Sequence, residues 1–277
     1  MRNLKYKLIC IDLDGTLLND NKEVSIENIK IIQEAIKKGV VICITTGRIL
    51  KFVDKYNDIL NISIPVIASN GSIIYYNNEE FEINSLTLEE ILEIKKIASK
   101  YNVDVYLNTD DSVICEKKIP SDYSYKVLKE KVIDKYKVKV IENYPFEKLF
   151  SNGKSNVVKA ICINKNDLEE IRKVRKELEE SVKFQVSSAE YEYCEINPKG
   201  VSKGGAVEKL AKKLNIEMDE VICIGDGGND LEMLKKAGFS VAMKNGMISV
   251  KEIADYITES NNDNGVGKVI KDLVLND

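Results

Sequence analysis

Short apolar runs alternate with amphipathic stretches in the first part of the chain. Runs in which nearly every side chain is hydrophobic are typical of parallel strands that are buried on both faces of a sheet. Three segments have this character, at residues 7–11, 40–45 and 65–68. Between the first two, Ser25 is placed to cap a helix and Gly39 to end it, and residues 49–60 form a second helical stretch. This order of elements predicts the start of a parallel sheet.

The pattern changes after residue 71. Residues 72–76 and 79–83 flank Asn77-Asn78 and predict a β-hairpin. In the following segment, we expect helices at 88–101, 123–135 and 167–178 and short strands at 103–107, 113–115, 138–141, 157–163 and 182–186. Such a mixture is α+β in character and indicates an inserted domain.

The alternating pattern returns from residue 191. Strands are expected at 191–196, 221–224 and 239–242, and helices at 202–214 and 231–237. The sequence therefore predicts an α/β protein with a Rossmann-like parallel-sheet core and an inserted α+β cap domain. The core would comprise residues 1–84 and 188–277, and the cap domain residues 85–187.

Composition fits a globular protein and excludes several classes. Of the 277 residues, 44% are hydrophobic and 31% are charged. The 41 basic and 45 acidic residues give a net charge of −4 without a basic block, so we expect no nucleic-acid partner. No apolar run could serve as a signal peptide or span a bilayer, so we expect a cytoplasmic protein without membrane contact. The six cysteines are scattered, mostly within apolar runs, and are expected to be buried, reduced thiols.

The chain contains no histidine. This absence excludes Ser-His-Asp triads, histidine-ligated zinc and histidine general bases. Any catalysis must therefore use carboxylates, lysine, thiols, hydroxyls or a metal ion held by oxygen.

Polar residues with catalytic potential follow four of the predicted strands. They form the segments 12–16 (Asp-Leu-Asp-Gly-Thr), 45–48 (Thr-Thr-Gly-Arg), 69–71 (Ser-Asn-Gly) and 225–230 (Gly-Asp-Gly-Gly-Asn-Asp). Ligands of open α/β sheets bind at the carboxyl ends of the strands, so these segments are expected to meet at one edge. Two acidic clusters brought together would repel each other, and Mg²⁺ is a hard cation that would relieve the repulsion. A carboxylate beside Mg²⁺ could then act as a nucleophile on phosphorus.

Each motif alone also has a purely structural explanation. An Asp-x-Asp-Gly sequence is often only a turn, and Asp230 could simply be favoured at a helix N-terminus. Lys203 could be a solvated residue in the first turn of a helix that Ser202 caps. Their common position at strand ends or helix starts of one predicted sheet favours a shared function.

Together these segments resemble the successive motifs of the haloacid dehalogenase superfamily. The resemblance is carried by residues 12–18, 46–48, 69–71, 200–204 and 225–233, and the tail agrees at 241–245, 254–258 and 264–266. More narrowly, the chain resembles the Cof-type phosphatases, in which an α+β cap is inserted after the third core strand. The cap itself matches in position and length more than in motif.

The resemblance implies roles for the acidic residues. Asp12 would be the nucleophile and a Mg²⁺ ligand. Asp14 would protonate the leaving alcohol and then activate water, while its backbone carbonyl would bind Mg²⁺. Asp226 would complete the metal shell, and Asp230 would support it.

The resemblance also implies a set of residues that bind phosphate or substrate. Lys203 would pair with the phosphate and offset the charge around Asp12, and the hydroxyl of Thr46 would hold a phosphate oxygen. The remaining members of this set are Gly47, Arg48, Asn70, Gly71 and Asn229.

By this resemblance, the protein is expected to be a Mg²⁺-dependent phosphatase of small phosphorylated metabolites, with sugar phosphates as the leading candidates. Hydrolysis would pass through an aspartyl phosphate on Asp12. A phosphomutase would use the same intermediate and is the nearest alternative. A regulatory protein of this fold without catalysis is a second alternative, against which the intact motif residues argue. No obligate protein partner is implied.

Tyrosines of the cap segment are candidates for contact with a substrate ring, although packing within strands is the more common role of such residues. They are Tyr123, Tyr125, Tyr144, Tyr191 and Tyr193.

Overall fold

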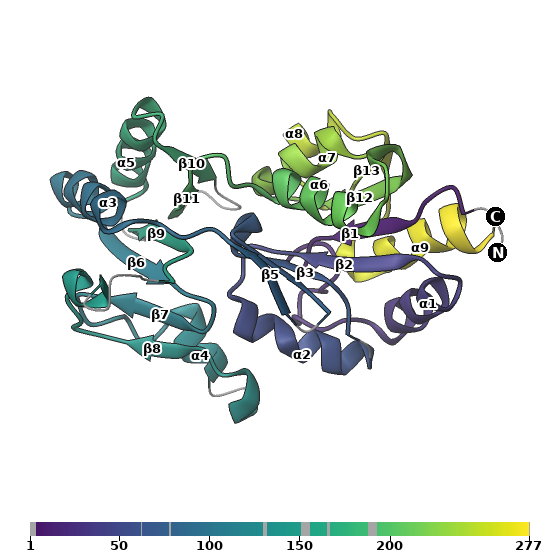
Figure 1. Ribbon diagram of the computed structural model, residues 1–277, viewed down its shortest axis with the longest axis horizontal. Helices are drawn as coiled ribbons and strands as arrows, with labels where there is room; N and C mark the ends of the chain where they lie inside the picture. The colour runs from purple at the N-terminus through teal and green to yellow at the C-terminus, as the bar shows by residue number, and fades with distance from the viewer. Residues whose placement is uncertain are drawn as a thin grey trace. The chain divides into compact units, whose positions relative to one another are not determined.

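The computed structural model describes residues 4–61, 63–77, 79–129, 132–150, 156–164, 167–187 and 193–276. The chain forms two compact units (Figure 1). Unit 1 runs from the start of the chain to Gly47 and includes Tyr56–Phe81 and the residues from Ser202 onwards. Unit 2 comprises Arg48–Lys55 and Glu82–Val201. The assignment of residues 85–187 to a cap domain stays a prediction.

An eight-stranded sheet forms the centre of unit 1, in the order β14-β13-β12-β1-β2-β3-β4-β5. Its strands are β1 (Leu8–Ile11), β2 (Val41–Thr45), β3 (Val66–Ala68), β4 (Ile73–Tyr76), β5 (Glu79–Ile83), β12 (Val221–Gly225), β13 (Phe239–Ala242) and β14 (Tyr256–Ile257). The strands from β14 to β3 pair in parallel, and β4 is antiparallel to β3. In this register Cys10 lies opposite both Cys43 and Cys223. The predicted parallel core is therefore confirmed.

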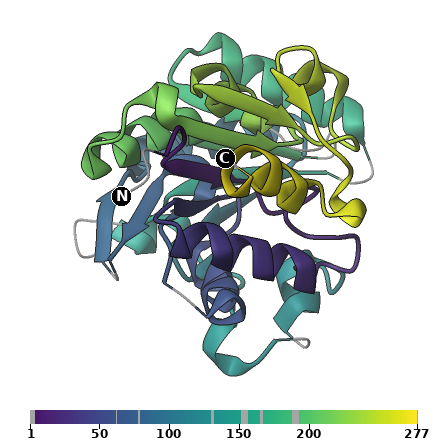
Figure 2. The same cartoon turned by 90° about the vertical axis from the view of Figure 1, so that its right-hand side faces the viewer.

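Helices cover the sheet of unit 1. They are α1 (Ile26–Lys37), α6 (Lys203–Leu214), α7 (Leu231–Lys236), α8 (Ile248–Lys251) and α9 (Gly265–Ile270), whereas α2 (Leu50–Leu60) begins in unit 2 and ends in unit 1. Short turns of 3₁₀ helix occur at η1 (Ser69–Gly71), η4 (Met218–Glu220), η5 (Gly228–Asp230) and η6 (Asn261–Asp263), and a π turn at η7 (Lys271–Leu275). Helices α6 and α7 pack against each other, as do α1 and α9 (Figure 2).

The predicted start and end of α1 are both confirmed. Ser25 is the N-cap, and its hydroxyl accepts a hydrogen bond from the backbone N–H of Asn28 at 3.1 Å. The helix ends at Lys37, and Gly39 follows with a φ of 98°, a conformation that favours glycine.

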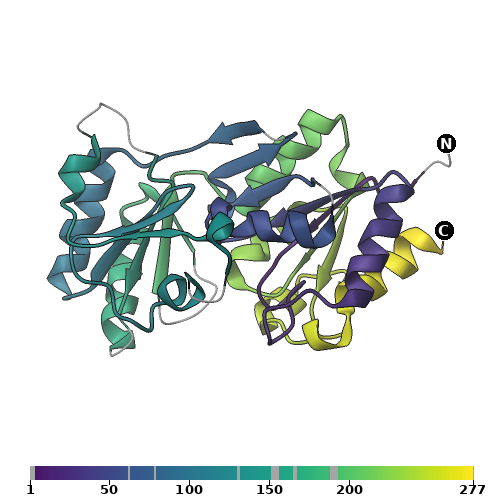
Figure 3. The same ribbon diagram turned by 90° about the horizontal axis from the view of Figure 1, so that it is seen from below.

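Unit 2 contains a six-stranded sheet in the order β10-β11-β9-β6-β7-β8. Its strands are β6 (Asp104–Asn108), β7 (Ser112–Cys115), β8 (Lys139–Ile141), β9 (Lys159–Ile163), β10 (Phe184–Ser187) and β11 (Tyr193–Pro198). Its helices are α3 (Leu88–Lys100), α4 (Ser124–Lys129) and α5 (Leu168–Glu180), with 3₁₀ turns η2 (Asp134–Tyr136) and η3 (Phe146–Phe150). Helices α3 and α5 lie next to each other along the sheet (Figure 3). They bury apolar residues against one of its faces.

Several elements differ from the sequence-based expectations. Strand β11, which we expected in the core, pairs with β9 and β10 in the sheet of unit 2. The helix expected at 123–135 is interrupted, since α4 ends at Lys129 and η2 follows. The elements expected from the sequence do not include the short elements β14, α8 and α9.

Buried side chains account for the cysteines and for part of the tyrosine set. All six cysteines are free and buried, as predicted. Tyr123 and Tyr125 are buried, and their ring centroids are 6.1 Å apart, so packing explains both residues. Asn78 of the predicted hairpin and Tyr191 lie outside the described residues.

Candidate active site

Two carboxylates follow adjacent parallel strands of unit 1. Asp12 comes directly after β1, and Asp226 comes directly after β12. Because Ile11 lies opposite Ile224, both side chains leave the same edge of the sheet. The backbone N–H of Asp12 also donates to the carbonyl of Ile224 at 3.0 Å, which fixes the start of the loop that carries Asp14.

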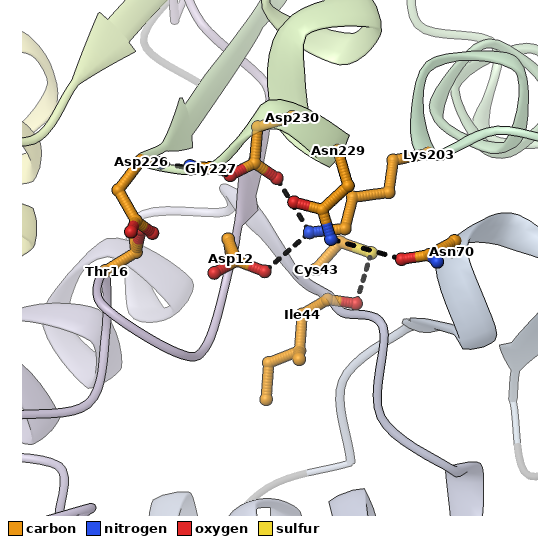
Figure 4. Close-up of polar contacts among 10 residues, drawn as sticks. All are labelled: Asp12, Thr16, Cys43, Ile44, Asn70, Lys203, Asp226, Gly227, Asn229 and Asp230. Atoms are coloured by element: carbon orange, nitrogen blue, oxygen red, sulfur yellow. Dashed lines mark hydrogen bonds and ion pairs between the residues drawn. The ribbon is translucent and has the colours of Figure 1, made fainter. Parts of the chain in front are cut away.

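Lys203 connects two of the acidic residues. It is the first residue of α6, directly after the N-cap Ser202, and its side chain is fully buried. Its ammonium lies 2.6 Å from Oδ1 of Asp12 and 2.7 Å from Oδ1 of Asp230 (Figure 4). The explanation of Lys203 as a solvated residue of the first helical turn is therefore wrong. A lysine in this position neutralises part of the negative charge that the sheet edge gathers.

Asp230 holds the loop after β12 in shape. Its side chain is completely buried, and Oδ2 accepts hydrogen bonds from the backbone N–H groups of Asp226 at 3.0 Å and Gly227 at 2.9 Å. A Cβ at Gly225 would lie 2.6 Å from the carboxyl carbon of Asp230, so glycine is required at this close approach. The carboxylate of Asp230 therefore positions the backbone that carries Asp226.

The loop after β1 lies against Asp226 through two residues. The hydroxyl of Thr16 donates to Oδ1 of Asp226 at 2.7 Å. Gly15 has a φ of 78°, and a Cβ there would lie 2.3 Å from Oδ2 of Asp226. The resemblance implies no role for Thr16, although this residue belongs to the Asp-Leu-Asp-Gly-Thr segment that follows the first predicted strand.

Asp14 differs in environment from the other acids. Its side chain is 38% exposed, and its Oδ1 lies 3.1 Å from the ammonium of Lys22. Among the described residues, the carboxylates that could share a metal ion are those of Asp12, Asp226 and Asp230, and Asp14 does not belong to this group.

Two amide side chains of the predicted set meet each other. Asn229 donates from Nδ2 to Oδ1 of Asn70 at 3.2 Å. The backbone N–H of Asn70 also donates to the carbonyl of Thr46 at 3.0 Å, which links the segments after β2 and β3. A Cβ at Gly71 would lie 2.2 Å from the carbonyl oxygen of Ser202, so the segment after β3 also contacts the start of α6.

The remaining residues of the set, Gly47 and Arg48, lie at the boundary between the two units in the sequence. Gly47 is the last residue of its segment in unit 1, and Arg48 belongs to unit 2. The guanidinium carbon of Arg48 lies 4.6 Å from the ring centroid of Phe52, which is the geometry of a cation–π contact.

Burial and charge crowding shift the ionisation of the acidic group. Burial raises the pKa of Asp12 well above its usual range, with Lys203 acting against this rise and Asp230 adding to it. Burial, together with the charge of Asp230, raises the pKa of Asp226 to about 7, whereas the hydroxyl of Thr16 lowers it. Burial alone would lower the pKa of Lys203, but Asp12 and Asp230 raise it above its usual range.

The same group offers the ligands that a hard divalent cation prefers. One carboxylate oxygen from each of Asp12, Asp226 and Asp230 lies within 4.8 Å of the others. The donors are oxygen atoms only, which fits Mg²⁺ better than a metal that prefers sulfur or imidazole. A bound cation would also remove the charge repulsion that raises the pKa of Asp226.

Comparisons with known proteins find relatives over nearly the whole chain. A family model described as haloacid dehalogenase-like hydrolase matches residues 9–270. The chain is 35% identical over 274 residues to 5-amino-6-(5-phospho-D-ribitylamino)uracil phosphatase YcsE of Bacillus subtilis, covering 99% of this chain and 98% of that protein. It is 31% identical over 287 residues to the phosphatase YwtE of the same organism, which has the same named substrate, covering 97% of this chain and 98% of YwtE.

A solved structure shows the same fold over nearly the whole chain. The structure of a haloacid dehalogenase-like hydrolase from B. subtilis superposes with a TM-score of 0.84 at 27% sequence identity. The match covers 97% of this chain and 100% of that one. No helix in the described part of this chain has the length and apolar character needed to cross a membrane.

Proposed function

Because this chain belongs to the haloacid dehalogenase-like hydrolase family and is a phosphatase of that family, we propose that it hydrolyses small phosphorylated metabolites through an aspartyl phosphate on Asp12. The observation that carries this proposal is the position of Lys203 between the carboxylates of Asp12 and Asp230. A buried cation at this point can bind a phosphate oxygen and hold a neighbouring carboxylate in one orientation.

Asp12 is suited to nucleophilic attack. Its Oδ1 is held by Lys203, whereas its Oδ2 makes no hydrogen bond within the described residues. In the first step, an oxygen of Asp12 would bond to phosphorus while the bond from phosphorus to the leaving oxygen breaks. The leaving oxygen would take a proton from Asp14. The products of this step are an acyl phosphate on Asp12 and the free alcohol.

Asp14 would act a second time when the intermediate is hydrolysed. It would take a proton from a water molecule, whose oxygen bonds to phosphorus while the bond between Asp12 and phosphorus breaks. Its partial exposure and its ion pair with Lys22 distinguish it from the buried acids and leave it accessible to water.

Mg²⁺ is the proposed cofactor, and Asp12 and Asp226 would hold it with the support of Asp230 and of the backbone carbonyl of Asp14. When bound, it would supply positive charge that stabilises the transferring phosphoryl group. Thr46, Asn70, Gly71 and Asn229 are proposed to bind the phosphate or the leaving group, together with Gly47 and Arg48. The contacts that join Asn70 to Thr46 and to Asn229 support this grouping.

The substrate class that we propose is a phosphorylated sugar or polyol. YcsE and YwtE are both named for a substrate with a phosphorylated ribityl chain, and each aligns with nearly the whole of this chain. The compound 5-amino-6-(5-phospho-D-ribitylamino)uracil is therefore the first specific substrate to test.

A metal-dependent phosphatase assay tests the proposal. The purified protein should release phosphate from p-nitrophenyl phosphate with Mg²⁺, and EDTA should abolish the release. A panel of phosphorylated sugars and polyols, including the ribitylaminouracil phosphate, should contain substrates with a higher kcat/KM than the aryl phosphate. Activity that is unchanged by EDTA, or no release of phosphate from any compound, would contradict the proposal.

A further inference from the structure

A pocket lies at one end of the six-stranded sheet, and all the residues that line it belong to unit 2. It occupies the point where β6 begins and β9 ends, which are neighbours in the sheet because Asp104 lies opposite Ile163. The last turn of α3 and the first turn of α5 also line the pocket, whose volume is about 950 Å³. The space is therefore large enough for a small organic molecule.

Negative charge predominates among the described residues that line this pocket. Four carboxylates, those of Asp104, Asp122, Asp167 and Glu170, stand against two lysine ammonium groups. The excess of two negative charges favours a ligand that carries positive charge.

The groups that could hold an anion are already engaged. The ammonium of Lys117 lies 2.6 Å from Oδ1 of Asp104, and Lys100 forms an ion pair with Glu177. At the start of α5, Oδ1 of Asp167 accepts hydrogen bonds from two backbone N–H groups of the first turn, at 3.1 and 3.3 Å. The positive end of this helix is thus capped by a side chain of the protein itself.

Two buried tyrosines present their hydroxyls to the pocket. Tyr106 is 3% exposed and Tyr123 is 7% exposed, and their rings form a T-shaped contact with 5.0 Å between the centroids. Neither hydroxyl makes a hydrogen bond with a described residue, and neither is completely shielded from the pocket. Most buried polar side-chain atoms in proteins have a partner, so these two hydroxyls are suited to a ligand that supplies one.

The hydroxyl of Tyr106 lies in the field of the carboxylates. Burial raises the pKa of Tyr106 above its usual range, and the charges of Asp104 and Asp122 add to this rise. The phenol therefore keeps its proton, and its oxygen can accept a hydrogen bond from an ammonium group, which donates only.

The carboxylates of the pocket are too widely spread for a metal ion. Among the described residues, three carboxylates close enough to share an ion occur only at Asp12, Asp226 and Asp230 of unit 1. Separated acidic groups fit a ligand whose positive charges are also separated. Tyrosine rings can cover the apolar chain between such charges and attract ammonium groups through their faces.

We propose that this pocket of unit 2 binds a linear polyamine, in which several ammonium groups are joined by short methylene chains. The ammonium groups contact the carboxylates of the pocket, and one of them donates to the hydroxyl of Tyr106. The methylene chain packs against the rings of Tyr106 and Tyr123. Binding at this site is independent of the proposed hydrolysis.

Calorimetric titration of the full chain with spermidine tests the site. Excess Mg²⁺ in the buffer competes for the carboxylates of unit 1, so that saturable binding reports the pocket. Glu170→Gln removes one carboxylate of the pocket and should weaken spermidine binding about tenfold. Glu169→Gln is the matched control, because it removes the same charge from the same helical turn and Glu169 does not line the pocket. It should change the affinity by less than about twofold.

A second variant and a second ligand test the contacts separately. Tyr106→Phe keeps the ring and removes only the hydroxyl, so the affinity for spermidine should fall by about three- to tenfold. Butylamine has a single ammonium group and should bind at least about tenfold more weakly than spermidine.

Four results would each overturn the site. They are no saturable spermidine binding by the wild type, equal weakening in Glu169→Gln and Glu170→Gln, wild-type affinity in Tyr106→Phe, and equal affinities for butylamine and spermidine. Equal weakening in the two glutamine variants would show a general attraction to acidic surface. None of these measurements uses phosphatase activity, so failure of this site is distinguishable from failure of the proposed function.

Discussion

The ammonium of Lys203 lies 2.6 Å from the carboxylate of Asp12, and the two side chains are 0% and 8% exposed. Within unit 1, this ion pair joins the first turn of α6 to the end of β1. A charge pair with so little contact with water is weakly screened. It therefore favours the ionised form of Asp12, which burial alone would disfavour.

Replacing Lys203 with methionine should remove most of the activity. The variant Lys203→Met keeps the apolar stem but leaves Asp12 and Asp230 without their shared cation. We expect kcat to fall by about 10²–10³-fold, the usual effect of removing one group that stabilises transition-state charge. Steady-state assays with p-nitrophenyl phosphate would measure this fall. Lys209→Met, at an exposed position of the same helix, is the control and should keep wild-type activity. Activity of Lys203→Met within twofold of the wild type would show that the cation is dispensable.

Gly15 provides a second test of the site, because its backbone lies against the carboxylate of Asp226. In Gly15→Ala, the new methyl group would lie 2.3 Å from Oδ2 of Asp226, so the carboxylate must move. We expect weaker Mg²⁺ binding and a large loss of kcat, both measured by titrating activity with Mg²⁺.

Gly200→Ala is a matched control for this substitution. Gly200 has a φ of 77°, close to the 78° of Gly15, but a Cβ there meets nothing within 4 Å. Both variants should therefore lose about 1 kcal/mol of stability from the strained backbone, whereas only Gly15→Ala should change the Mg²⁺ requirement. If both variants required the same Mg²⁺ concentration for half-maximal activity, the contact between Gly15 and the carboxylate of Asp226 would have no role in metal binding.

The raised pKa of Asp226 predicts that metal binding depends on pH. Its pKa is about 7 in the folded protein, against about 3.9 in an unfolded chain. The folded state therefore retains a proton that the unfolded state has lost, so without metal this group reduces stability as pH rises from about 4 through 7. A cation must displace that proton. Mg²⁺ affinity should therefore rise between about pH 6 and 8, with protons released below pH 7.

Calorimetric titration with Mg²⁺ in buffers of different ionisation enthalpy measures both the Mg²⁺ affinity and the number of protons released on binding. Thr16→Val sharpens the test, because the Thr16 hydroxyl lowers the pKa of Asp226 through its 2.7 Å hydrogen bond. Without that bond, the rise in affinity should move to higher pH. An affinity that is constant with pH, without proton release, would show that Asp226 is already ionised or is not a ligand.

The proximity of Asp12 and Asp226 could be predicted from the sequence, because the strand that each residue follows determines its position in the fold. Both residues follow apolar runs, and neighbouring parallel strands end at one edge of the sheet. The side-chain partners of other residues depend on loop conformation, which hydrophobic periodicity does not encode. The ion pair of Asp14 with Lys22 and the contact of Arg48 with Phe52 are therefore visible only in the structure.

The sheet of unit 2 shows a second limit of sequence patterns. The apolar alternation of β11 correctly indicates a strand, but it does not say which sheet contains that strand.

The covalent intermediate on Asp12 is the central claim, and its capture is the most direct test. In Asp14→Asn, attack on p-nitrophenyl phosphate should still occur, because the nitrophenolate leaves without a proton, whereas water is no longer activated. The variant should therefore accumulate phosphate on the protein in the presence of Mg²⁺. Acid quenching followed by peptide mass spectrometry should find one phosphoryl group on Asp12, and borohydride reduction should convert that residue to homoserine. Turnover by the wild type with no label on Asp12 in the variant, or with the label on another residue, would contradict the account.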